Sequence, residues 1–102
     1  MSMNIQNQAG DEKIIALMET QEGIAYGVEG TCLAGRYVYS VVHYFVPFDT
    51  EPVYVDLSNV SYTNCQNLEV YDTNRFGFIV RAEVIADGGA IFEFAWHADL
   101  IT

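Results

Sequence analysis

The chain has 102 residues, of which 51% are hydrophobic and 14% aromatic, and its net charge of −10 comes from fourteen acidic and only four basic side chains. This composition predicts one folded domain with its own core and excludes an intrinsically disordered chain. The scarcity of Lys and Arg argues against direct binding of nucleic acid or of an anionic membrane surface, because both require basic side chains.

The N-terminal segment predicts a flexible arm over residues 1–10, rich in Asn and Gln, followed by a single globular domain over residues 11–102. The arm lacks the basic and apolar regions of a signal peptide, and the chain has no apolar run long enough to span a membrane. We therefore expect a cytoplasmic protein with no membrane contact. Cys32 and Cys65 have no metal-site spacing, so we expect two reduced, partly buried thiols.

Residues 11–22 fit two interpretations. In the first, Asp11 caps a helix that ends before Gly23 and has four apolar residues on one face, Ile14, Ile15, Leu17 and Met18. In the second, residues 19–23 form a hairpin turn that leads into a strand over residues 24–28. We place strand ahead of helix because the rest of the chain shows the alternation typical of β-strands.

Four glycines follow at short intervals and indicate a bulged or bent strand, because no GxGxxG or Walker pattern accompanies them: Gly23, Gly27, Gly30 and Gly35. The next stretch, residues 36–46, has apolar or aromatic side chains on both faces. It therefore predicts either a central strand covered on both sides or a strand whose second face lies at a partner interface. The second face supplies a candidate aromatic interface or pocket that includes Tyr37, Tyr39 and His43.

The middle of the chain predicts shorter elements. Pro47 and Pro52 bracket residues 48–51, which we expect to form an exposed acidic connection. A strand over residues 53–58, a polar segment over 58–67 interpreted as a frayed or edge strand, and a short strand over 68–71 follow.

Two alternating stretches flank Asp87-Gly88-Gly89 near the C-terminus and predict a β-hairpin with a three-residue loop. Its predicted register pairs Ala86 with Ala90, Val84 with Phe92, Ala82 with Phe94, Val80 with Trp96 and Phe78 with Ala98. In this register Glu83 lies opposite Glu93 on the outer face.

The six or seven predicted strands indicate a mainly β fold, namely a small antiparallel barrel or sandwich with a meander-like strand order. If residues 11–22 are helical, the fold is α+β instead.

The outer face of the predicted hairpin is the candidate partner-binding surface, because isoleucines lie there among charged side chains. Its members are Ile79, Arg81, Glu83, Ile85, Asp87, Glu93, His97 and Asp99. The alternative is that a second layer of the same domain covers the isoleucines.

No catalytic or metal-binding motif of the HExxH, GxSxG, CxxC or EF-hand type is present. His97 and Asp99, about 7 Å apart on one strand face, are the candidate pair for catalysis or metal binding. We assign no catalytic residue, metal ion or cofactor and expect a non-catalytic protein, with an enzyme kept as an alternative.

Our leading hypothesis is an acidic protein-binding module that occludes a basic surface of a partner protein, such as a nucleic-acid-binding surface. In general character it is similar to toxin-immunity proteins and to phage-encoded inhibitors that compete with nucleic acid. The similarity is one of composition, and no family motif matches a residue here. One alternative is a homo-oligomeric structural subunit that uses the aromatic face of residues 36–46. Another is a small-molecule-binding barrel or enzyme with a pocket around Tyr37, Tyr39, His43 and Trp96.

Overall fold

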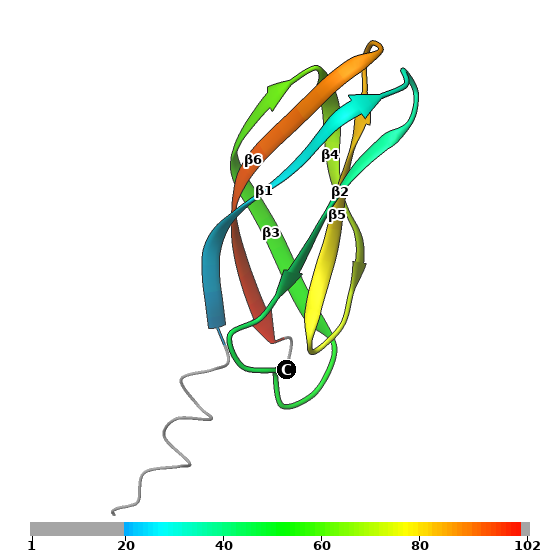
Figure 1. The fold of residues 1–102 in the computed structure, drawn as a ribbon. Helices are drawn as coiled ribbons and strands as arrows, with labels where there is room; N and C mark the ends of the chain where they lie inside the picture. The colour runs from blue at the N-terminus through cyan, green and yellow to red at the C-terminus, as the bar shows by residue number, and fades with distance from the viewer. Residues whose placement is uncertain (1–19, 101–102) are drawn as a thin grey trace, which may run out of the picture.

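The computed structural model describes residues 20–100, which form six antiparallel strands in two three-stranded sheets (Figure 1). Sheet A has the strand order β1 (Thr20–Cys32), β6 (Gly88–Leu100) and β3 (Val53–Thr63). Sheet B has the order β2 (Tyr37–His43), β5 (Gly77–Val84) and β4 (Cys65–Thr73). The predicted mainly β fold is therefore confirmed, and its strands form two antiparallel sheets, consistent with the sandwich alternative.

The start of β1 decides part of the ambiguity at residues 11–22. Residues 20–32 form one continuous strand, so a helix that continues to residue 22 and a hairpin turn over residues 19–23 are both wrong from Thr20 onward, whereas the predicted strand over residues 24–28 is part of β1. The extended conformation there follows from pairing, because Thr20 and Gly23 lie opposite Asp99 and Trp96 of β6. The predicted arm over residues 1–10 and the segment over residues 11–19 lie outside the described residues.

The core lies between the two central strands, β5 and β6. Alternate residues of both strands point inward and are almost completely buried: Phe78, Val80, Ala82 and Val84 from β5, and Ala90, Phe92, Phe94, Trp96 and Ala98 from β6. The period-2 pattern thus predicted the inward rows of both strands correctly, because successive side chains of a strand point to opposite faces.

The predicted hairpin between these strands is wrong. β5 pairs with β2 and β4, whereas β6 pairs with β1 and β3, so residues 85–87 cross from sheet B to sheet A. The two apolar rows do not pair with each other but meet across the interior, where both are buried. A hairpin and a crossing between sheets thus both remove these rows from water. In this arrangement each central strand also forms hydrogen bonds on both of its edges. The order is consequently not a meander, and among consecutive strands only β4 and β5 pair with each other.

Asn64, between β3 and β4, holds the crossing segment in place. Its side-chain amide donates hydrogen bonds to the carbonyl oxygens of Ala86 (2.7 Å) and Gly89 (3.0 Å), and its Oδ1 accepts one from the Ala86 N–H (3.0 Å). Asn64 has a φ of 60°, a left-handed conformation that Asn tolerates better than most residues. Asn59 and Asn67 also have positive φ values, at two irregularities in pairing register within β3 and β4.

One side of the sandwich is closed by contacts of β1 with β2 and with the segment that follows β2. Ser40 Oγ donates to the Tyr26 carbonyl oxygen (2.9 Å), and the buried Gln21 side chain donates to the Val46 carbonyl oxygen and accepts from the Phe45 N–H. Gly27 permits this approach, because a Cβ there would stand 3.0 Å from the Tyr39 carbonyl oxygen of β2 and 2.5 Å from the Phe92 ring of β6. The pairing of β1 shifts between Glu29 and Cys32, as the glycine spacing predicted for a bulged strand.

Three further expectations meet different outcomes. The polar segment over residues 58–67 lies in edge strands as predicted, but it is divided between the end of β3 and the start of β4, which also contains the predicted strand over 68–71. β2 is also an edge strand, so the alternative of a central strand covered on both sides is wrong. Residues 49–51 are exposed as predicted, but Phe48 is fully buried and packs edge-on against Tyr44 with ring centroids 4.8 Å apart. Its aromatic ring is therefore part of the core rather than of an exposed connection.

Candidate interaction surface

The residues of the predicted partner-binding surface lie on two opposite faces. Ile79, Arg81 and Glu83 point outward from β5 on sheet B, whereas Glu93, His97 and Asp99 point outward from β6 on sheet A. Ile85 and Asp87 lie in the segment that joins the two sheets, where Asp87 Oδ1 accepts a hydrogen bond from the Ala34 N–H (2.9 Å). No single contact surface in the described residues includes all eight.

The outer face of sheet B has a cluster of aromatic side chains around one guanidinium group. We call it the tyrosine face and define it by Tyr37, Tyr39, Val41, Tyr71, Ile79 and Arg81. The Arg81 guanidinium carbon lies 4.2 Å from the ring centroid of Tyr37 and 4.3 Å from that of Tyr71. The Tyr39 and Tyr71 rings meet edge-on at 6.0 Å, so side chains from all three strands form one ordered cluster.

Arg81 is held by an ion pair as well as by the aromatic rings. Its Nε donates to Glu69 Oε2 at 2.9 Å across the β4–β5 pairing. This hydrogen bond to Glu69 is the main cause that raises the pKa of Arg81 above its ordinary value, so the guanidinium keeps its charge at any physiological pH. The cluster is thus a fixed arrangement rather than a set of independent side chains, although an exposed ion pair contributes little to stability.

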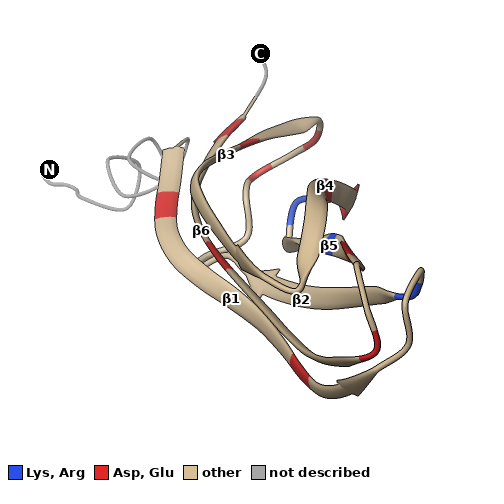
Figure 2. Cartoon of the chain, turned by 90° about the horizontal axis from the view of Figure 1, so that it is seen from above, with Lys and Arg blue, Asp and Glu red and all other residues tan. Residues whose placement is uncertain are grey.

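The surroundings of the tyrosine face are acidic. The described residues contain three arginines, Arg36, Arg75 and Arg81, and no lysine, while acidic residues occur on both sheets and in the connections (Figure 2). On the outer face of sheet B, Glu83 and Asp72 lie beside the Arg81–Glu69 pair. This face therefore presents aromatic rings within a negative surface.

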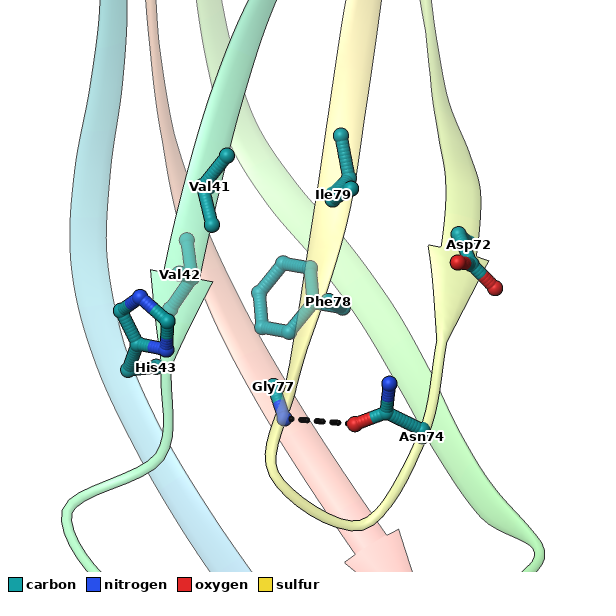
Figure 3. A pocket seen from close by; sticks show the side chains of 8 residues that line it. All are labelled: Val41, Val42, His43, Asp72, Asn74, Gly77, Phe78 and Ile79. Atoms are coloured by element: carbon teal, nitrogen blue, oxygen red, sulfur yellow. Dashed lines mark hydrogen bonds between the residues drawn. The ribbon is translucent and has the colours of Figure 1, made fainter.

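A hollow of about 140 Å³ lies at one end of the same outer face. Its lining includes Val41 and His43 of β2, Gly77 and Ile79 of β5, and Asp72 and Asn74 from β4 and the turn that follows (Figure 3). Asn74 Oδ1 accepts hydrogen bonds from the N–H groups of Phe76 (2.8 Å) and Gly77 (3.2 Å) and so shapes the turn. A Cβ at Gly77 would collide with the Val42 carbonyl oxygen, so only glycine fits there.

The predicted pocket around Tyr37, Tyr39, His43 and Trp96 does not form. Trp96 is only 4% exposed and packs inside the sandwich against Phe78 and Tyr44, with ring centroids 5.4 and 5.9 Å away. Tyr37 and Tyr39 point outward on the tyrosine face, and His43 lines the hollow with other neighbours. The sheet itself separates Trp96 from the three other side chains.

The outer face of sheet A carries an aliphatic group and a histidine–carboxylate pair. Val28 lies opposite Ile91 and Ile24 opposite Ala95; we call the exposed residues Ile24, Val28 and Ile91 the aliphatic face. Further along the sheet, His97 Nδ1 lies 3.1 Å from Asp99 Oδ2. Cross-strand pairing places Glu22 and Asp56 on either side of His97.

Neither the histidine pair nor the cysteines form a recognisable reactive centre. Within residues 20–100, no group of three or more His, Cys, Asp or Glu side chains is arranged to hold a metal ion. Cys32 and Cys65 are free and buried, as predicted, and Cys65 Sγ donates to the Ile91 carbonyl oxygen at 3.3 Å. Burial raises the pKa of the Cys65 thiol, which lowers its reactivity as a nucleophile.

Comparisons of the chain with protein-family models, with curated proteins and with solved structures find no match. Over the described residues, the structure has no helix with the length and apolar character needed to cross a membrane. Sequence reasoning missed Glu69, Tyr71, Asp72, Asn74 and Gly77 as members of the outer face of sheet B. The alternation of polar and apolar residues would have assigned the β4 residues to a face, but it is broken because the pairing of β4 shifts register twice.

Proposed function

We propose that this protein is a non-catalytic binding module whose tyrosine face contacts a basic surface of a partner protein. The observation that carries the proposal is the ordered cluster in which Tyr37 and Tyr71 flank Arg81, surrounded by carboxylates. Tyr and Arg are enriched at the centres of protein interfaces, and side chains already held in place lose little entropy on binding.

The charge supports the choice of partner. A surface poor in cations and rich in carboxylates attracts a basic partner over long range and repels nucleic acid. A module bound to a basic nucleic-acid-binding surface would inhibit that partner by occupying the site. In this proposal the protein acts in the cytoplasm, where two free thiols stay reduced.

A photo-crosslinking experiment tests which face binds. Tyr39 and Tyr54 are 48% and 55% exposed, on sheet B and sheet A respectively, so a benzophenone amino acid at either position probes one face with similar access. We expect an adduct with a basic protein from position 39 alone, in cell extract of the natural source, at low and moderate salt. Equal adducts from both positions, or none from position 39, would contradict the proposal.

Matched alanine variants measure the contribution of the face to affinity. We expect Tyr39→Ala to weaken binding of the captured partner by roughly 2 kcal/mol, or about thirtyfold, as for an interface hot spot. Tyr54→Ala, on the opposite sheet, should leave the dissociation constant within about twofold. Similar losses for both variants would show that the effect is not specific to the tyrosine face.

A homo-oligomeric structural subunit is the second candidate, favoured by the aliphatic face of sheet A. Ile24, Val28 and Ile91 are exposed on two neighbouring strands, and burying them against another copy would remove apolar surface from water. Sedimentation equilibrium distinguishes this candidate, because an apolar contact persists at high salt. Ile24→Arg should then yield monomers, whereas a monomer at all concentrations for the unaltered chain would exclude it.

A further inference from the structure

We propose that the hollow at Gly77 receives an arginine side chain of the partner. This inference rests on the proposed function and deepens it, because it names the partner group that would dock beside the tyrosine face. Three features favour this occupant: the shape of the hollow, its charge, and an arginine that the same face already holds.

The shape suits a long side chain with an apolar stem. At the position of Gly77 the central strand has no side chain between β2 and β4, and the collision with the Val42 carbonyl oxygen prevents any other residue from filling the gap. Val41 and Ile79, which lie opposite each other in the pairing of β2 and β5, together form an apolar wall of the hollow. Methylene groups of an inserted side chain would pack against this wall, as the stems of Arg and Lys do on apolar surfaces.

The charge at the rim suits a cation. Asp72 lines the hollow, and within the described residues no arginine forms a salt bridge with it. The nearby arginines are engaged elsewhere: Arg75 Nε donates to the Phe48 carbonyl oxygen while its guanidinium lies over Phe76, and Arg81 pairs with Glu69. A guanidinium that enters the hollow would therefore meet a carboxylate that no arginine of residues 20–100 already pairs with.

The same face already holds one guanidinium group beside a carboxylate. Arg81 combines a carboxylate partner, Glu69, with aromatic neighbours from both edge strands, Tyr37 and Tyr71. A planar, weakly hydrated guanidinium forms two parallel hydrogen bonds with a carboxylate and accepts partial burial better than a compact ammonium group. These properties favour arginine over lysine as the occupant.

Nuclear magnetic resonance titration of the ¹⁵N-labelled full chain tests the inference with three probes: the N-acetyl amides of arginine, lysine and citrulline. Citrulline has the shape of arginine without its charge. We expect saturable shifts of the Gly77 and Ile79 amide signals with the arginine probe, weaker ones with lysine and none with citrulline. Equal responses to arginine and citrulline, a stronger response to lysine, or no shift at Gly77 would overturn the inference.

Two matched variants test whether the Asp72 carboxylate binds the guanidinium group of the arginine probe. Asp72→Asn should weaken the arginine response at Gly77 at least tenfold, whereas Asp56→Asn, the same change on the outer face of sheet A, should leave it unchanged. A well-dispersed ¹⁵N–¹H spectrum of each variant would show that it is folded. An unchanged arginine response in Asp72→Asn would refute the role of this carboxylate. Since the titration needs no partner protein, its failure is distinguishable from failure of the crosslinking at Tyr39.

Discussion

Glu83 and Glu93 lie on opposite outer faces of the sandwich, with the hydrophobic core between them. Glu83 is on β5, between Tyr37 and Gln66 of the neighbouring strands, and Glu93 is on β6, between Tyr26 and Ser61. The two carboxylates therefore face different surroundings, and a substitution at one of them leaves the opposite outer face unaltered.

Charge reversal at these positions separates the two faces in a binding experiment. Glu83→Lys adds a cation beside Tyr37 and should weaken binding of a basic partner about tenfold, mostly by slowing association at low salt. Glu93→Lys makes the same change in net charge on sheet A and should have a much smaller effect. Surface plasmon resonance at two salt concentrations measures both. A larger effect of Glu93→Lys would move the binding surface to sheet A.

Gly27 is expected to be intolerant of a side chain. A methyl group there would stand 2.5 Å from Phe92 Cζ and 3.0 Å from the Tyr39 carbonyl oxygen, so Gly27→Ala should lower the free energy of unfolding by about 1–3 kcal/mol through overpacking. Gly30→Ala is the matched control, because a Cβ at Gly30 meets no atom within 4 Å. Urea denaturation of both variants checks the expectation, and equal stabilities would argue against the close contact of β1 with β2 and β6.

Trp96 lies in the hydrophobic core and is expected to be costly to truncate. Trp96→Ala should reduce the free energy of unfolding by roughly 3–5 kcal/mol, because the buried indole packs against Tyr44 and Phe78. Phe45→Ala removes a ring that touches the same indole but is largely exposed, so it should cost far less. Denaturant midpoints give the comparison, and similar losses would mean that Trp96 is not a core residue.

Tyr44 provides a test at alkaline pH. Burial raises the pKa of its phenol above the ordinary 10.0, despite an opposing contribution from the hydrogen bond with Thr73. The phenol therefore ionises in the unfolded chain before it ionises in the folded one, so its contribution to stability is complete below pH 10 and is lost as the pH rises above that value.

The free energy of unfolding should consequently fall as the pH rises above 10, and fall less steeply in Tyr44→Phe. Tyr54→Phe, which alters an exposed tyrosine on sheet A, should retain the slope of the unaltered protein. Urea titrations at several pH values measure these slopes. Identical slopes for Tyr44→Phe and the unaltered protein would contradict the assignment.

Alternation along residues 77–100 was sufficient to identify which side chains face the core. Phe78 and Val84 on one strand and Phe92 and Trp96 on the other were assigned inward correctly, because the direction of a side chain in a strand is a local property of the backbone. The same alternation is compatible with a hairpin and with a crossing between sheets, since both bury the same rows. Asn64, distant in sequence, is one of the contacts that hold the crossing.

What the sequence determined by itself was the β class, the inward rows and the acidic character, all of which depend on composition or on near neighbours. Only the tertiary structure decided the surfaces. Tyr37 and Tyr71 approach Arg81 because β2 and β4 pair with opposite edges of β5, and Glu83 is separated from Glu93 because their strands belong to different sheets. Such relationships depend on which strands pair across long sequence separations, and a period-2 pattern contains no information about that choice.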